Sequence, residues 1–165
     1  MNIFQAMKPN LTASSVMEIP FSDLKAQGKT TVLLDFDNTL GPDHATAPGE
    51  FAFEVIKMLS DLGYKLILVS NAKSGRSSGI AEKLGIPCVT YAHKPRPVGV
   101  IKAMEKMGST PDQCIMVGDQ IFTDVIAGRL AGVYTVMVEK YAPKEIWYIV
   151  LKRPFEKIVR LIGRF

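Results

Sequence analysis

The chain of 165 residues has the length of one ordinary domain, and its 47% apolar and 22% charged residues exclude wholesale disorder and collagen-like structure. Its longest apolar run, residues 146–151, is far shorter than the roughly 20 residues of a membrane span, and residues 1–9 lack the pattern of a signal peptide. The net charge of +4 resides in residues 141–165, which hold six basic and two acidic residues, whereas residues 1–140 are balanced.

Short apolar runs rich in Val, Ile and Leu recur along the chain, separated by segments with apolar residues at helical spacing. The runs do not alternate in polarity, which is typical of parallel strands buried on both faces. They lie at Thr31–Phe36, Lys65–Val69, Cys88–Thr90, Cys114–Val117 and Tyr134–Val138. The four helical segments between them end at or near Gly63, Gly85, Gly108 and Gly132. This order predicts a doubly wound α/β fold with a parallel five-stranded sheet.

Polar residues lie at or directly after the ends of four of the predicted strands. In a doubly wound sheet, ligands bind beyond the carboxyl ends of the strands, so these residues are expected to share one site. They are Asp35, Asp37, Thr39, Ser70, Asn71, Lys94, Asp119 and Asp124. Neighbouring carboxylates repel unless a cation neutralises them, and carboxylates with water and phosphate oxygens are the usual ligands of Mg²⁺. With a lysine for the phosphate oxygens, the set predicts a Mg²⁺-dependent phosphoryl-transfer site with an aspartate nucleophile.

These residues also carry a resemblance to a known family. The run Asp35-Phe36-Asp37-Asn38-Thr39-Leu40 resembles the D-x-D-x-T signature of haloacid dehalogenase (HAD) superfamily phosphatases. Ser70, then Lys94-Pro95, then Gly118-Asp119 with Asp124 follow in the order of that superfamily, over residues 31 to about 138. The stretches at 92–97 and 118–125 look like the YqeG-like group of HAD subclass IIIA, which is related to phosphatidylglycerophosphate phosphatases.

The resemblance implies a role for each of these residues. Asp35 would be the nucleophile that forms an aspartyl-phosphate, and Asp37 would be the general acid and base. Mg²⁺ would be held by Asp35, the main-chain carbonyl of Asp37 and Asp119, with Asp124 supporting these ligands from outside the coordination sphere. The substrate phosphate would be bound by Thr39, Ser70, Asn71 and Lys94. Lys94 is also counted as a catalytic residue.

The spacing of the motifs leaves no room for a cap domain. Eleven residues separate Leu40 from the predicted helix start at Ala52, and 23 separate Ser70 from Lys94. A loop and one helix use up both intervals. An uncovered site resembles those HAD members that act on macromolecules or lipid headgroups, or that close by forming oligomers.

We expect three parts in the chain: an N-terminal lead-in segment at 1–30, a HAD-like phosphatase core at 31–140 and a basic tail at 141–165. In the tail, the apolar residues fall at i, i+3, i+4 and i+7 and the basic residues on the opposite face, which predicts an amphipathic helix. Its apolar face has two candidate partners. One is the domain's own sheet or a second subunit of a homo-oligomer, and the other is an anionic membrane surface contacted through residues 144–165.

The expected function is dephosphorylation of phosphatidylglycerophosphate at the membrane surface. The alternatives are a phosphatase of nucleic-acid ends or another phosphorylated macromolecule, and a non-catalytic interaction module on the same fold. Both cysteines, Cys88 and Cys114, lie in apolar runs and are expected to be reduced. We therefore expect a cytoplasmic protein with a peripheral position at the inner face of the membrane.

A second catalytic motif is weaker. Gly75-Arg76-Ser77-Ser78-Gly79 matches the G-x-S-x-G pattern of serine hydrolases. In those enzymes the serine lies in the sharp turn directly after a strand, whereas Ser77 stands eight residues past Val69. The position argues against a serine nucleophile.

Overall fold

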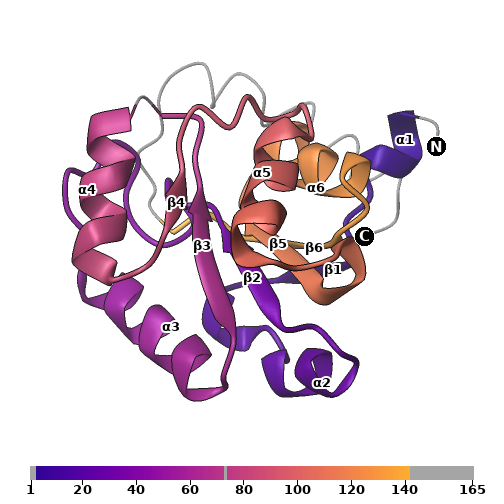
Figure 1. Ribbon diagram of the computed structural model, residues 1–165, viewed down its shortest axis with the longest axis horizontal. Helices are drawn as coiled ribbons and strands as arrows, with labels where there is room; N and C mark the ends of the chain where they lie inside the picture. The colour runs from indigo at the N-terminus through magenta and orange to yellow at the C-terminus, as the bar shows by residue number, and fades with distance from the viewer. Residues whose placement is uncertain (1–2, 73, 142–165) are drawn as a thin grey trace.

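A computed structural model describes residues 3–72 and 74–141 of the chain (Figure 1). Its sheet has six strands in the order β1-β6-β5-β2-β3-β4, and every neighbouring pair is parallel. The strands are β1 (Leu11–Ala13), β2 (Thr31–Leu34), β3 (Lys65–Val69), β4 (Cys88–Val89), β5 (Cys114–Gly118) and β6 (Tyr134–Val138). All four residues of β2 pair with β3 on one side and β5 on the other, so β2 lies at the centre.

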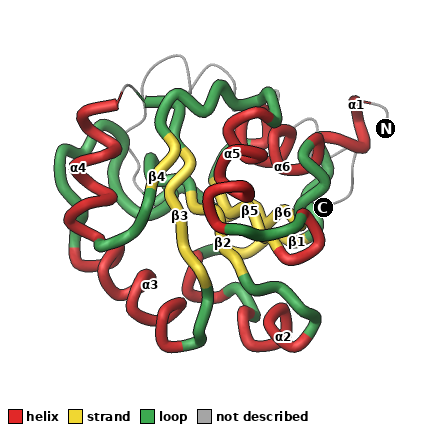
Figure 2. The backbone as a smooth tube through the Cα atoms, viewed as in Figure 1, coloured by secondary structure: helices red, strands yellow, loops and turns green. Residues whose placement is uncertain are grey.

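Helices cover both faces of this sheet, with α3 and α4 on one side and α5 and α6 on the other (Figures 1 and 2). Because successive strand residues point to opposite faces, Val32 and Leu34 pack with α3 and α4, whereas Leu33 packs with α5 and α6. The helices are α1 (Ile3–Ala6), α2 (Phe21–Ala26), α3 (Glu50–Asp61), α4 (Ser74–Leu84), α5 (Val98–Met107) and α6 (Ile126–Leu130), with short 3₁₀ turns η1 (Val16–Glu18) and η2 (Pro111–Gln113) and a π turn η3 (Ile121–Val125).

The predicted doubly wound parallel sheet is confirmed, but it has six strands rather than five. The additional strand, β1, has only three residues and runs along the edge of the sheet beside β6. An edge strand of this length leaves no apolar run in the sequence. Asn10 fixes its position, because the side-chain oxygen of Asn10 accepts hydrogen bonds from the main-chain N–H and the hydroxyl of Thr135 at 2.9 and 3.1 Å.

Residues before the first predicted strand pack against the core. Phe21 and Leu24 of α2 are buried, and the hydroxyl of Tyr64 donates to the carbonyl of Phe21 at 2.7 Å. The segment expected as a lead-in thus supplies one strand and one buried helix, while the division of the chain at residue 141 stays a prediction. The predicted C-terminal amphipathic helix lies outside the described residues. None of the helices in the described ranges has the length and apolar character needed to cross a bilayer.

The connections that lead to the site are short. Within the described residues, 41–49 form a loop that enters α3 directly, and 71–93 hold α4 and β4 and no further domain. The expected absence of a cap is therefore confirmed for this part of the chain. From β2 the chain proceeds to β3 and β4 on one side and then returns to β5 and β6 on the other. The crevice of such a sheet lies where the strand order reverses, beyond the carboxyl ends of β2 and β5.

Candidate active site

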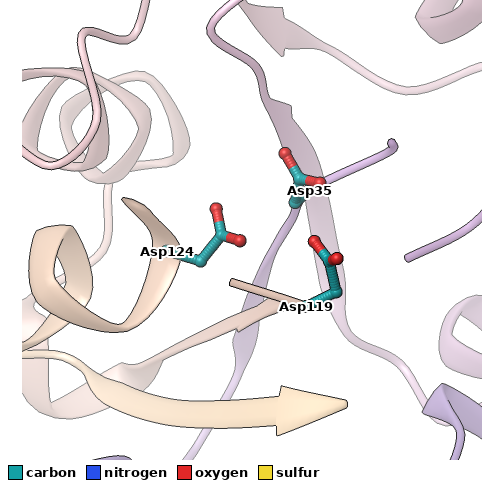
Figure 3. A group of neighbouring side chains, drawn as sticks. All are labelled: Asp35, Asp119 and Asp124. Carbon is teal, nitrogen blue, oxygen red and sulfur yellow. The ribbon is translucent and has the colours of Figure 1, made fainter. Parts of the chain in front are cut away.

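Two aspartates follow the central strands at the point where the strand order reverses. Asp35 comes directly after β2 and Asp119 directly after β5, and both are buried. The main-chain N–H of Asp35 donates to the carbonyl of Val117 at 2.9 Å, so the strand pairing extends to this residue. Figure 3 shows the side chains of Asp35, Asp119 and Asp124 converging, and one carboxylate oxygen from each lies within 4.8 Å of the others.

Asp124 reaches this cluster from η3. Its Oδ2 accepts a hydrogen bond from the main-chain N–H of Gln120 at 3.1 Å. Gly118 permits the approach, because a Cβ at that position would lie only 2.3 Å from Cγ of Asp124. The glycine before Asp119 is thus required by the close passage of a second carboxylate.

Lys94 bridges two members of the cluster. Its Nζ lies 2.6 Å from Oδ1 of Asp35 and 2.6 Å from Oδ1 of Asp124, and the side chain is buried. Asn71 holds the loop that carries this lysine. The side-chain amide of Asn71 donates to the carbonyl of Lys94 at 2.9 Å, and its oxygen accepts from the N–H of Lys94 at 2.7 Å. Asn71, predicted to bind the substrate phosphate, thus contacts the main chain of the lysine.

Burial dominates the electrostatics of the cluster. It raises the pKa of Asp35 to about 7; Lys94 opposes this shift, and the nearby charges of Asp124 and Asp37 add to it. Burial alone would lower the pKa of Lys94, but Asp124 and Asp35 outweigh it and raise that pKa above its ordinary value. Three aspartates thus gather in a buried cluster of the described residues, and Lys94 pairs with two of them. This excess of negative charge is what a bound cation would neutralise.

Two hydroxyl groups lie beside the cluster. The Oγ of Ser70, directly after β3, accepts hydrogen bonds from the N–H of Ala72 at 3.1 Å and from the hydroxyl of Ser77 at 2.9 Å. With both bonds accepted, the proton of the Ser70 hydroxyl is available for an incoming acceptor. Thr39 makes a weak hydrogen bond to Oδ2 of Asp35 at 3.5 Å.

A second ion pair joins the loop after β2 to helix α4. The guanidinium of Arg76 lies in a parallel fork on Asp37, with Nη1 to Oδ1 at 2.6 Å and Nη2 to Oδ2 at 2.5 Å. Nη1 also donates to the carbonyl of Ala45 at 3.2 Å. The hydrogen bond with Asp37 raises the pKa of Arg76. Both oxygens of Asp37 are therefore bound by a side chain on a neighbouring element.

The structure brings the predicted residues to one cavity of about 280 Å³. Of the eight, six line it: Asp35, Asp37, Ser70, Asn71, Lys94 and Asp124. Asp119 is buried within the carboxylate cluster, and Thr39 contacts Asp35. Sequence reasoning missed Arg76, which also lines the cavity, and Ser77, which contacts Ser70. Both belong to the G-x-S-x-G pattern. In the structure this pattern lies at the start of α4, which begins only four residues after Ser70, and this short distance along the chain is what places the two residues near the site.

The carboxylate cluster is suited to a divalent cation. Its donors are all carboxylate oxygens, in a buried position, and no His or Cys belongs to the group. Oxygen-only donor sets favour hard cations such as Mg²⁺ over Zn²⁺. Asp124 already accepts hydrogen bonds at both oxygens, from Lys94 and from the N–H of Gln120. Oδ2 of Asp35 accepts only a weak hydrogen bond, from Thr39 at 3.5 Å, so Asp35 is better placed than Asp124 to act as a ligand.

Comparison with known proteins points to one family. The model of the haloacid dehalogenase-like hydrolases matches residues 21–132. The chain is 27% identical over 149 residues to a probable phosphatase, YqeG, of Bacillus subtilis, covering 90% of this chain and 87% of that protein. It is 28% identical over 158 residues to phosphatidylglycerophosphate phosphatase 1 of Arabidopsis thaliana, covering 88% of this chain but only 44% of the plant protein.

Solved structures share the fold. The cobalt-bound form of the deoxy-D-mannose-octulosonate 8-phosphate phosphatase of Haemophilus influenzae superposes with a TM-score of 0.56 at 18% identity, over 83% of this chain and 90% of that one. An uncharacterized protein from Listeria monocytogenes superposes with a TM-score of 0.55 at 13% identity, over 82% and 99%. At these low sequence identities, the similarity concerns the fold alone, that is, the arrangement of strands and helices.

Proposed function

The chain belongs to the haloacid dehalogenase-like hydrolase family and is a phosphatase, and on this premise we propose that it hydrolyses phosphomonoesters through an aspartyl-phosphate on Asp35. The observation that carries the proposal is the position of the Asp35 carboxylate, which Lys94 fixes inside a cluster of three buried aspartates. A carboxylate fixed in this way is oriented toward the cavity before the substrate arrives, which removes part of the entropic cost of attack.

In the first half of the proposed reaction, a carboxylate oxygen of Asp35 attacks the phosphorus atom. The bond between phosphorus and the leaving oxygen breaks, and Asp37 gives that oxygen a proton, so the alcohol departs. Lys94 and the hydroxyl of Ser70 donate to the oxygens of the phosphoryl group, where the charge is spread during transfer. Ser77 and Asn71 act indirectly, since they position Ser70 and Lys94.

In the second half, water attacks the phosphorus of the aspartyl-phosphate. Asp37, now a carboxylate, takes the proton of this water, and the bond between phosphorus and the Asp35 oxygen breaks. Inorganic phosphate leaves and Asp35 is regenerated. The same side chain thus serves as acid and then as base, which requires that it can contact the leaving oxygen and the water in turn.

Mg²⁺ is the proposed cofactor. Asp35 and Asp119 would hold it together with the main-chain carbonyl of Asp37, and Asp124 would support the ligands through its contacts with Lys94 and Gln120. When bound, the ion offsets the negative charge that gathers on the phosphoryl oxygens. The all-oxygen donor set and the excess of carboxylates over lysine support this choice.

For the substrate, we propose the phosphomonoester of a phosphatidylglycerophosphate headgroup. Two observations support it: relatives named as phosphatidylglycerophosphate phosphatases match about 90% of this chain, and the described residues hold no cap over the cavity. The basic amphipathic pattern of residues 144–165 supports a position at the anionic inner membrane surface. Co-sedimentation with anionic vesicles, reduced by salt and by truncation after residue 142, is the expected result. Equal binding to neutral vesicles would contradict it.

The test is release of inorganic phosphate from a substrate panel. The panel holds phosphatidylglycerophosphate in mixed micelles, oligonucleotides with 5′-phosphates and soluble sugar phosphates, each assayed with Mg²⁺, with Ca²⁺ and with EDTA. We expect Mg²⁺-dependent release that is fastest from the lipid, with Ca²⁺ a poor substitute because it prefers longer bonds and more ligands. Faster release from oligonucleotides would reassign the substrate, and activity that survives chelation would contradict the metal site.

A further inference from the structure

Arg76 has no role in the chemistry proposed above, although its guanidinium lies in the cavity. It binds both oxygens of Asp37 at 2.5 and 2.6 Å, in the bidentate geometry that is the strongest form of such a pair. Its further contact is the carbonyl of Ala45, at 3.2 Å. Arg76 lies on α4, and both of its contacts, Asp37 and Ala45, belong to the loop after β2.

The fork competes with the role proposed for Asp37. Both oxygens of Asp37 accept hydrogen bonds from Arg76, and Oδ1 also accepts one from the main-chain N–H of His44 at 3.3 Å. A fork that opens or slides when the substrate enters frees an oxygen of Asp37 to contact the leaving oxygen. An opened fork leaves the guanidinium with unsatisfied donors, and hydrogen bonds to charged groups are costly to lose without replacement.

A replacement anion can reach Arg76 from the cavity, which Asp43 also lines and where the charge of Asp43 acts on Arg76. Two side chains of permanent positive charge line this cavity among the described residues, Lys94 and Arg76. Lys94 is 2% exposed and engaged by two aspartates, whereas the side chain of Arg76 is 20% exposed. An anion on the leaving-group side of the substrate would thus meet Arg76. Its planar fork matches an anion that offers two oxygens, as a phosphodiester does.

We propose that Arg76 is a specificity-determining residue that exchanges Asp37 for the phosphodiester anion of the leaving group, which releases Asp37 to contact the leaving oxygen. The assignment rests on the proposed function, since in a phosphatidylglycerophosphate headgroup the leaving alcohol carries a phosphodiester on the same glycerol. One substrate then offers its phosphomonoester to Asp35 and its diester to Arg76. A phosphomonoester without the second anion leaves the fork closed and is hydrolysed more slowly.

The test uses two matched substrates. One is a short-chain phosphatidylglycerophosphate, and the other is its methyl phosphotriester analogue, in which the diester is uncharged. Initial rates with Mg²⁺ give kcat/KM for both substrates in the wild type, Arg76→Met, Arg76→Lys and, as a control, Lys57→Met, which breaks an exposed ion pair with Asp61. The ratio of the two values within one variant cancels any general damage to the fold or the site.

The wild type and Lys57→Met are expected to prefer the charged substrate by at least about 10-fold, the effect of one charge-assisted hydrogen bond. In Arg76→Met the ratio falls to about 1, and Arg76→Lys, which keeps the charge without the fork, retains part of the preference. Equal rates in the wild type, or a full preference in Arg76→Met, would overturn the assignment while leaving the phosphatase proposal intact. No hydrolysis of these or other phosphomonoesters by the wild type would overturn both.

Discussion

Asp35 and Asp37 stand two residues apart and each pairs with a cation, but the two ion pairs lie in different surroundings. Lys94 and Asp35 have side-chain exposures of 2% and 11%, and this lysine also contacts Asp124. Arg76 and Asp37 have exposures of 20% and 21%. The first pair lies inside the carboxylate cluster at the strand ends, whereas the second joins a loop to the surface helix α4.

The difference in burial separates a pair that holds its geometry from one that can change partners. Breaking a buried ion pair leaves a charge without solvent or counter-ion, which costs several kcal/mol, whereas a pair that water can reach costs less to open. Asp35 is therefore fixed for attack on phosphorus. Asp37, which has to contact the leaving oxygen and then water, is held by the pair that opens at lower cost.

The largest effect is expected from changing the fixed carboxylate itself. Asp35→Asn should lower kcat by at least about 10³-fold, because an amide cannot form the aspartyl-phosphate. The fold should persist, since the side chain keeps its size and Lys94 retains Asp124. Phosphate release and circular dichroism check both expectations. The matched control, Asp61→Asn, changes an exposed aspartate outside the cavity and should keep wild-type activity; substantial turnover by Asp35→Asn would contradict the mechanism.

Replacing the basic side chain of each ion pair in turn compares the two pairs directly. Lys94→Met should lower the free energy of unfolding by about 3–5 kcal/mol in the absence of Mg²⁺, because Asp35 and Asp124 remain buried without their counter-ion. Arg76→Met should cost less than this, because the Asp37 left behind is in contact with solvent. Urea unfolding at neutral pH measures both losses, and Mg²⁺ should restore more stability to Lys94→Met than to Arg76→Met. Equal losses would show that burial does not separate the two pairs.

Asp37→Asn tests the carboxylate of the more exposed pair. It should lower kcat about 10²-fold, the contribution of one general acid and base, because an amide neither donates a proton to the leaving oxygen nor takes one from water. The loss should be smaller for a substrate with an aryl leaving group, which departs without a proton. Comparison of kcat/KM for glycerol and nitrophenyl phosphates isolates the departure of the leaving group and measures this difference, and an equal loss of kcat/KM on both would contradict the role of Asp37 as the acid.

Gly118→Ala tests how tightly the buried cluster is packed. The new Cβ would lie 2.3 Å from Cγ of Asp124, so the carboxylate has to shift away from Lys94. We expect a loss of about 2 kcal/mol in stability, as for other overpacked sites, with weaker activation by Mg²⁺. Gly79→Ala is the matched control, since no heavy atom lies within 4 Å of a Cβ there. Equal effects of the two substitutions would contradict the steric requirement at Gly118.

The sequence predicts most of the buried half of the site. Unbroken apolar runs specify parallel strands, and in such a sheet the residue after each strand is directed to one edge, so Asp35 and Asp119 follow from the pattern alone. The five strands with apolar runs appear in the structure within two residues of their expected ends. β1 is absent from the pattern because a three-residue edge strand needs no apolar run.

The more exposed part of the site is harder to predict, because it depends on how a helix surface faces a loop. Nothing in the spacing of Asp37 and Arg76, 39 residues apart, indicates that their side chains meet. Asn71 illustrates the same limit. Its position after β3 places it at the site, but whether its amide faces a phosphate or the main chain of Lys94 depends on the path of a distant loop.

The account depends most on the covalent step at Asp35, and trapping the intermediate tests it directly. During turnover with Mg²⁺ and substrate, borohydride reduces an aspartyl-phosphate to homoserine, and mass spectrometry of the digested protein locates the change. The prediction is homoserine at position 35 alone, absent without substrate and absent in Asp35→Asn. Phosphate release at the full rate with residue 35 unmodified, or with homoserine at position 37 instead, would contradict the account.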